Sequence, residues 1–250
     1  MANFGSFWIG GPRNGPLTKL QWVSLASYIY HGHSFTLYVY DENLLVPEGV
    51  IKKDAREIMR EDELFYAKGQ PDGLGKDLPA PSADLFRYRL LNAVDTIWSD
   101  CDMLCFSDDF SFIKDDYLFS IEPNTKCVNG DLLKLPRGSA VLLDLIQKAE
   151  DYPKKSIKWA EIGPFLITTV FENHNILNKE IPFHMTHVFT NEEWYKYWQP
   201  EYKEEVIDKC RNAKTASIYN ALATYHISDR NSFPVGSALE YFYNKFVKGK

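Results

Sequence analysis

The chain has 250 residues, and 28 Lys or Arg against 34 Asp or Glu give a formal net charge of −6. This length suits one large domain or two small ones, and 45% hydrophobic with 25% charged residues is ordinary for a globular protein. The composition excludes global disorder, a collagen-like chain and a coiled coil. The acidic balance argues against a nucleic-acid partner, because such proteins usually carry a basic face.

Two further sequence features bear on localisation. No segment approaches the roughly 18 apolar residues of a membrane span, and the first residues lack the basic and apolar regions of a signal peptide. We therefore expect a cytoplasmic protein, with peripheral membrane association as the alternative. The cysteines agree with this expectation, because their spacing matches no usual zinc site and cytosolic thiols stay reduced; they are Cys101, Cys105, Cys127 and Cys210.

The N-terminal part predicts a β-α-β unit. A short apolar run at 6–9 ends at Gly10-Gly11-Pro12 and predicts a buried first strand. Apolar residues at helical spacing predict a helix from about Pro16 to His31, and a second strand is expected at 35–40. Two strands joined by a helix are expected to be parallel.

The middle of the chain begins with a glycine- and proline-rich segment at 67–81, which predicts a long, mobile loop. A helix is expected from about Ser82 to Val94, with Ser82 as its N-cap. A strand at 96–99 follows, and it leads through Asp100-Cys101-Asp102 into another apolar run at 103–106.

The rest of the chain continues to alternate. We expect helices at 138–149, 163–174 and 201–213, a strand at 223–227, and a last helix at 237–247 within the C-terminal segment 237–250. Neither a repeat nor an interdomain linker is evident. The sequence therefore predicts a single α/β domain over 1–250, with a Rossmann-like mixed sheet flanked by helices.

The D-x-D segment is the first candidate site. Asp100 and Asp102 follow a predicted strand, and ligands of open α/β sheets bind at the carboxyl ends of strands. Carboxylate oxygens suit Mg²⁺ or Mn²⁺, and such an ion can hold a diphosphate and neutralise its charge. The alternative is an ordinary solvated acidic turn, since Asp is common in turns.

The helix before this strand carries a second candidate pair. Asp84 and Arg87 are three residues apart and project from one side of the helix. A guanidinium can grip phosphate or sugar oxygens, and a carboxylate can accept hydrogen bonds from sugar hydroxyls. The alternative is a surface ion pair, worth about a few tenths of a kcal/mol.

Three segments together carry a family resemblance: Phe7-Trp8-Ile9-Gly10-Gly11, the segment 84–91 (DLFRYRLL), and Trp98-Ser99-Asp100-Cys101-Asp102. In this order and spacing they resemble the DXD-containing sugar transferases, in particular glycosyltransferase family 32 and its bacterial capsular-polysaccharide relatives. The glucosyltransferase domains of large clostridial toxins are similar at a greater distance. The resemblance covers most of residues 4–230.

The resemblance implies a GT-A fold, a UDP- or GDP-sugar donor, and a divalent metal, most often Mn²⁺ or else Mg²⁺. The segment 159–164 resembles the family's W-G-x-x-G-P segment and supplies a further carboxylate. The resemblance places donor-binding roles on Trp8, Ile9, Asp84, Arg87, Asp100 and Asn129; metal-ligating roles on Asp100, Asp102, His226 and Ser228; and roles in catalysis on Asp84, Arg87 and Glu161.

The function that the resemblance implies is a metal-dependent, retaining glycosyltransferase of polysaccharide biosynthesis. It would move a sugar from a nucleoside diphosphate to a hydroxyl of a glycan or lipid-linked saccharide. One alternative is a non-catalytic nucleotide-sugar or carbohydrate-binding module. Another is a phosphohydrolase with Asp100 as nucleophile and Asp102 as acid, although such enzymes generally carry D-x-D on their first strand.

Overall fold

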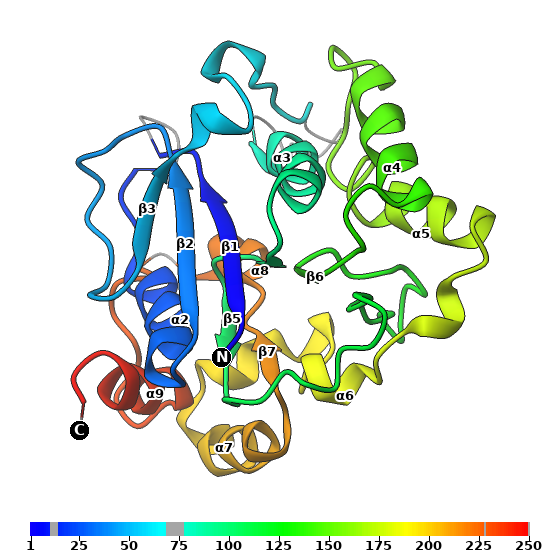
Figure 1. The fold of residues 1–250 in the computed structure, drawn as a ribbon. Helices are drawn as coiled ribbons and strands as arrows, with labels where there is room; N and C mark the ends of the chain where they lie inside the picture. The colour runs from blue at the N-terminus through cyan, green and yellow to red at the C-terminus, as the bar shows by residue number, and fades with distance from the viewer. Residues whose placement is uncertain (11–14, 69–77, 228, 250) are drawn as a thin grey trace.

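The structure, a computed structural model, describes residues 1–10, 15–68, 78–227 and 229–249. Its main sheet has five strands in the order β3-β2-β1-β4-β6 (Figure 1). The first four are parallel, and β6 is antiparallel to β4. The predicted α/β class with a mixed sheet is confirmed. The strands are β1 (Asn3–Trp8), β2 (Ser34–Val39), β3 (Ile51–Asp54), β4 (Ile97–Ser99) and β6 (Leu132–Leu133).

The predicted β-α-β unit is confirmed, with helix α2 (Lys19–Tyr30) between β1 and β2. The helix begins after Thr18, whose amide donates to the Gln21 side chain at 3.0 Å. It ends before Gly32, which adopts a positive φ of 78° that glycine tolerates without strain. The two strands are parallel in full register, from Asn3 opposite Ser34 onward.

Helix α3 (Ala80–Ala93) precedes β4 and begins earlier than the sequence predicts. The prediction that Ser82 caps this helix is wrong, because Pro79 occupies the N-cap and Ser82 lies within the first turn. The Ser82 hydroxyl is buried and bonds both the amide and the carbonyl of Phe65. Ser82 thus joins the first turn of α3 to the segment around Phe65. Residues 69–77 of the predicted 67–81 loop lie outside the described residues.

A second, two-stranded antiparallel sheet pairs β5 (Met103–Cys105) with β7 (Thr215–Ser217). The strand predicted at 223–227 is wrong, because this stretch belongs to helix α8 (Asn220–His226). Backbone hydrogen bonds of helical spacing run from the Ala223 amide to the Tyr219 carbonyl and from the Ile227 amide to the Ala223 carbonyl. A five-residue apolar run does not distinguish a strand from a helix by periodicity.

The other helices pack outside α2 and α3 or around the small sheet. They are α4 (Ala140–Asp151), α5 (Pro164–Asn173), α6 (Phe183–Thr186), α7 (Lys203–Asn212) and α9 (Ala238–Phe246). Short 3₁₀ helices lie at Ala55–Glu57, Glu61–Glu63, Leu177–Lys179, Asn191–Tyr197 and Pro200–Tyr202. Among the described residues, none of the helices combines the length and apolar character needed to cross a bilayer.

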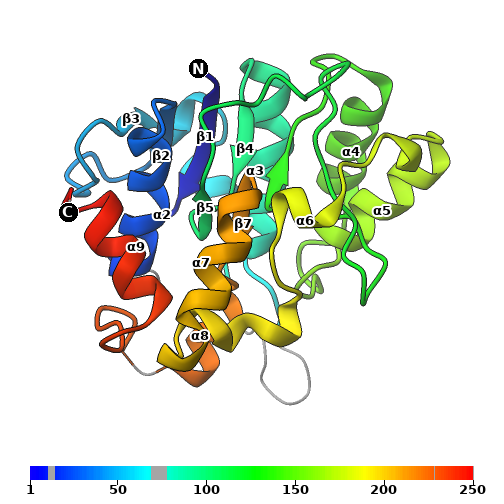
Figure 2. The same ribbon diagram turned by 90° about the horizontal axis from the view of Figure 1, so that it is seen from below.

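Side-chain alternation along the strands explains the layers. Phe7 of β1 and Tyr38 of β2 join the core cluster formed with α3, α4 and α5. Phe4, Leu37 and Val39 point to the opposite face, where α2 packs. Both views show α3, α4 and α5 on one side of the sheet and α2 with α9 on the other (Figures 1 and 2). The carboxyl ends of β1 and β4 therefore lie between the helices on the two sides of the sheet.

Candidate functional site

The candidate site forms where β4 ends beside β1. Gly5 lies opposite Trp98 in this parallel pair, so the strands run on toward Trp8 and Asp100 at the same sheet edge. This is the edge at which α/β sheets bind ligands. The preceding helix α3 brings Asp84 and Arg87 to the same place.

Arg87 is the buried centre of this site. Its Nη1 atom lies 2.9 Å from Asp84 Oδ1 and its Nη2 atom 3.2 Å from Asp100 Oδ1. The side chains of Arg87 and Asp84 are only 5% and 9% exposed. The indole Nε1 of Trp98 donates to the same Asp100 oxygen at 2.6 Å. The alternative of a solvated surface ion pair is therefore wrong.

Two glycines press closely against this ion pair. A Cβ atom on Gly130 would lie 2.2 Å from Arg87 Nη1, and one on Gly163 would lie 2.7 Å from Asp84 Oδ2. Neither glycine has a positive φ, so close approach rather than backbone conformation requires glycine here. The segment before β6 and the segment before α5 thus enclose the pair from two sides.

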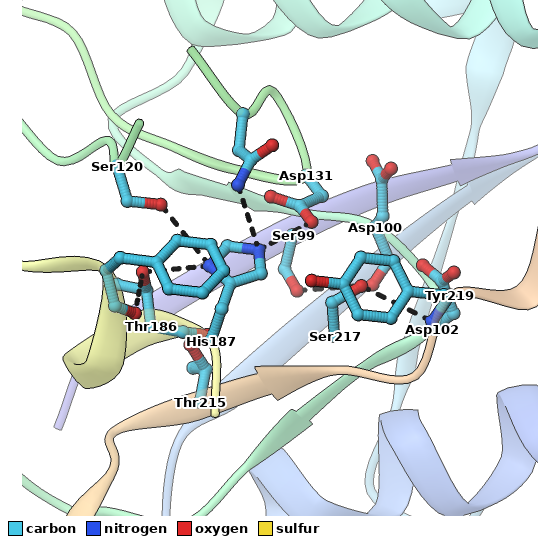
Figure 3. A network of polar contacts seen from close by, with 12 residues as sticks. Ser99, Asp100, Asp102, Ser120, Asp131, Thr186, His187, Thr215, Ser217 and Tyr219 are labelled. Atoms are coloured by element: carbon cyan, nitrogen blue, oxygen red, sulfur yellow. Dashed lines mark hydrogen bonds and ion pairs between the residues drawn. The ribbon is translucent and has the colours of Figure 1, made fainter. Parts of the chain in front are cut away.

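Asp102 faces the connection between β7 and α8. Its Oδ2 accepts the amide of Asn220 at 2.8 Å, and its carbonyl accepts the amide of Ile218 at 3.0 Å. Tyr219 between them adopts a left-handed conformation with φ 49°. Figure 3 shows Asp102 and Tyr219 beside Asp100 at the end of the sheet.

Two residues that the sequence analysis missed, Asp131 and His187, complete this polar cluster (Figure 3). The carbonyl of Asp131 accepts the amide of Asp100 at 2.7 Å. Its Oδ2 lies 2.8 Å from Nε2 of His187, which is 1% exposed. Asn129, predicted to bind the nucleotide-sugar donor, places its side-chain nitrogen 3.5 Å from the same Nε2 atom.

Burial sets the protonation of the carboxylates. Burial raises the pKa of Asp84 to about 6 against the pull of Arg87, and burial with the nearby Asp100 charge raises that of Asp102 to about 7. Burial also raises the pKa of Asp100. At Asp131 burial acts in the same direction, but His187, Arg87 and the backbone amide of Leu132 together outweigh it and hold the pKa below its usual range.

The cluster therefore carries more acidic groups than the single guanidinium balances. Hard carboxylate oxygens fit a divalent cation. Across the residues that the structure describes, no three His, Cys, Asp or Glu side chains converge closely enough to enclose an ion. Asp100 and Asp102 fit a cation only if other oxygens, such as those of a diphosphate, complete its coordination, as is usual for Mg²⁺.

The aromatic candidate lies at the same edge. Trp8 ends β1 half-buried, and its indole Nε1 donates to the carbonyl of Gly15 at 3.2 Å. Ile9 follows it and packs against the core cluster that includes α3. Both residues thus lie at the carboxyl end of β1, the strand beside β4, with part of the indole exposed.

Two predicted site residues, His226 and Glu161, have no described bond to this cluster. His226 ends α8, is exposed, and stacks on Trp194 with ring centroids 5.2 Å apart. No described hydrogen bond or ion pair connects it to Asp100 or Asp102. Glu161 accepts the amide of Lys158 at 2.7 Å. Ser228 lies outside the described residues.

Of the two missed residues, Asp131 could have been found from the sequence, whereas His187 could not. Asp131 follows Asn129 and Gly130 directly, so a polar segment before an apolar pair already marked this region. His187 lies directly after α6, before Val188 and Phe189, and no sequence pattern separates it from the other histidines.

Comparisons with known proteins add little to this geometry. No family model matches the chain, and no curated protein matches it. A solved structure titled "PaToxG Glycosyltransferase" resembles it at 9% sequence identity with a TM-score of 0.48, covering 99% of this chain and 84% of that one. A likeness at this level carries no information on activity.

Proposed function

We propose that the chain is a metal-dependent glycosyltransferase. It moves a sugar from a nucleoside-diphosphate sugar to a hydroxyl of a glycan or lipid-linked saccharide. The observation that carries the proposal is the buried Arg87 guanidinium, fixed between Asp84 and Asp100 where β4 ends. A buried cation of fixed orientation at this edge suits an anionic ligand with polar substituents.

One donor of Arg87 has no partner within the described part of the chain. Among the described residues no acceptor reaches its buried Nε atom, although Nη1 and Nη2 bond Asp84 and Asp100. Leaving a buried donor without a partner costs about 1–3 kcal/mol. A departing diphosphate gains negative charge as the bond to the sugar breaks, and a preorganised guanidinium stabilises that charge.

Asp100 and Asp102 would hold the cation together with diphosphate oxygens. A divalent ion there, Mn²⁺ or Mg²⁺, neutralises charge on the leaving group. The amide of Asn220 occupies one oxygen of Asp102, which leaves its Oδ1 for the ion.

The remaining contacts follow from position. Trp8 would stack on the nucleobase at the end of β1, with Ile9 beside it. Asp84 would accept hydrogen bonds from hydroxyl groups of the donor sugar, and the amide of Asn129 would donate one to it. Retention of the anomeric configuration is proposed from the family resemblance alone.

The test is turnover of a panel of nucleotide sugars with and without Mn²⁺, for wild type and Arg87→Lys. We expect Mn²⁺-dependent release of the nucleoside diphosphate from at least one donor, and a large loss in the variant, because lysine lacks the planar fork. The matched control is Arg89→Lys, since Arg89 lies on the same helix but pairs with Glu63 and Glu150.

Two other outcomes would contradict the proposal. Binding of nucleotide sugars without any turnover would support a binding module instead. Release of inorganic phosphate from phosphomonoesters, lost in Asp100→Asn, would support a phosphohydrolase.

A further inference from the structure

Asp131 is the direct cross-strand neighbour of Asp100. The β4–β6 pairing places Trp98 opposite Leu133 and Ser99 opposite Leu132, and the bond from the Asp100 amide to the Asp131 carbonyl continues this register. Opposed residues of an antiparallel pair lie on the same face, where like charges destabilise each other. The two carboxylates therefore require separate compensation.

Each carboxylate has its own partner. Arg87 and Trp98 hold Asp100, whereas His187 holds Asp131 through a 2.8 Å contact from Nε2 to Oδ2. The other ring nitrogen of His187, Nδ1, lies 2.9 Å from the hydroxyl of Thr186. The ring is thus fixed on both edges in a site that is almost fully buried.

Only one oxygen of Asp131 is held in this way. Its Oδ1 atom is buried, and no described group donates a hydrogen bond to it. An unsatisfied charged acceptor costs more than the 1–3 kcal/mol of a neutral one. The side chain as a whole keeps 18% of its surface exposed, although Oδ1 itself is covered. A free acceptor held this firmly is suited to a ligand's donor group.

The position of this acceptor identifies the ligand group. Gly130, the residue before Asp131, lies against Arg87, where the proposed function puts the diphosphate. Because the proposed function already gives the cation to Asp100 and Asp102, Oδ1 of Asp131 is left for a hydroxyl group beside the diphosphate.

We propose that Asp131 binds a hydroxyl of the donor sugar through Oδ1, and that His187 is the positioning residue that orients this carboxylate. The inference rests on the proposed function and assigns a sugar contact within the same site. Asp131 and Asp84 then approach the sugar from different segments, the residue before β6 and helix α3.

The first test compares two affinities of Asp131→Asn by calorimetry with Mn²⁺: UDP against UDP-glucose, and GDP against GDP-mannose. We expect the nucleotide-sugar affinity to fall about tenfold or more, as for loss of a hydrogen bond to a charged group, and the diphosphate affinity to stay within about threefold. The matched control is Asp144→Asn, because Asp144 also pairs with a histidine, His174, but between α4 and α5.

The outcomes separate the two proposals. Equal losses for diphosphate and nucleotide sugar would place Asp131 on the cation and overturn the inference. Unchanged affinities in Asp131→Asn, with normal binding by wild type, would overturn the inference alone. If wild type binds neither pair, the proposed function falls and the inference falls with it.

The second test concerns His187. His187→Ala is expected to reproduce the selective loss for the sugar nucleotide, with a raised KM for the donor, and His187→Gln, which keeps a donor, to restore part of it. A purely structural role would lower both affinities together and show no rescue. If His187→Ala does not fold, His187→Gln is compared with His174→Gln, and equal donor KM values in those two variants would overturn the role.

Discussion

Asp84 and Arg87 lie one turn apart on α3 and form a buried ion pair of 2.9 Å that Asp100 extends to the end of β4. Removing one partner from a buried pair leaves an uncompensated charge, which costs about 3–5 kcal/mol of stability. A variant that keeps the charge is therefore a better probe of chemistry than alanine.

We expect Arg87→Lys to lower kcat by about a hundredfold or more, the range seen when a donor that stabilises transition-state charge is lost. The affinity for nucleoside diphosphate should change much less, because the interaction strengthens as the leaving group departs. Steady-state kinetics beside calorimetry on the same protein measures both. Equal losses in kcat and affinity would assign Arg87 to ground-state binding only.

The glycine before Asp131 gives a second prediction. Gly130→Ala would place a methyl group 2.2 Å from Arg87 Nη1, so the guanidinium must move. We expect loss of most transfer activity in a protein that still folds, measured by kinetics and thermal unfolding. The control is Gly138→Ala, whose Cβ meets nothing within 4 Å but whose φ is 67°. That variant should lose stability and keep its activity.

The sequence predicted the helices and strands that local patterns determine. The β1-α2-β2 unit, α3 and β4 follow from apolar periodicity and turn residues, and the resemblance put Asp84, Arg87, Asp100 and Asp102 in one place. The structure brings these four residues together through α3 and β4. Their roles toward ligands remain predictions.

The elements that the sequence did not predict depend on contacts between residues distant in the chain. β6 has only two residues and is recognisable only from its pairing with β4. Helix α8 begins after Tyr219 in a left-handed conformation and docks on Asp102, which lies more than a hundred positions earlier. His187 joins the site because α6 packs near β7, through the bond from the Thr215 hydroxyl to the Thr186 carbonyl. No local pattern encodes these contacts.

The metal proposal predicts a specific failure. Asp102→Asn should abolish Mn²⁺-dependent transfer and weaken Mn²⁺ binding in the presence of nucleoside diphosphate, because an amide oxygen is a poorer ligand for a hard cation than a carboxylate. Titration of Mn²⁺ by electron paramagnetic resonance measures binding apart from activity. The control is Asp95→Asn, since Asp95 pairs with Lys134 before β4 begins. Full activity of wild type in EDTA would exclude the metal.

The base-binding proposal rests on the half-buried indole at the end of β1. Trp8→Ala should weaken nucleoside-diphosphate binding by roughly ten- to a hundredfold, since stacking of a base on an aromatic ring is worth about 1–3 kcal/mol. Trp8→Phe keeps a ring and should lose less. If calorimetry shows unchanged UDP and GDP affinities in a folded alanine variant, Trp8 is a core residue without a ligand role.

The pKa of Asp84 gives the last prediction, which concerns stability. Burial raises this pKa from 3.8 to about 6 in the folded chain, although Arg87 opposes the shift. Below the unfolded pKa the carboxyl is protonated in both states. As the pH rises to about 6, the unfolded chain loses the proton first, so the contribution of Asp84 to stability is lost. At about 1.4 kcal/mol per pKa unit, the loss approaches 3 kcal/mol.

Urea unfolding at several pH values should therefore show wild type losing stability relative to Asp84→Asn over this range. Asp144→Asn is the control, because hydrogen bonding to Lys148 lowers the pKa of Asp144, so its contribution to stability is lost only as the pH falls below its ordinary pKa of 3.8. Parallel curves for wild type and Asp84→Asn would show that Asp84 stays ionised beside Arg87.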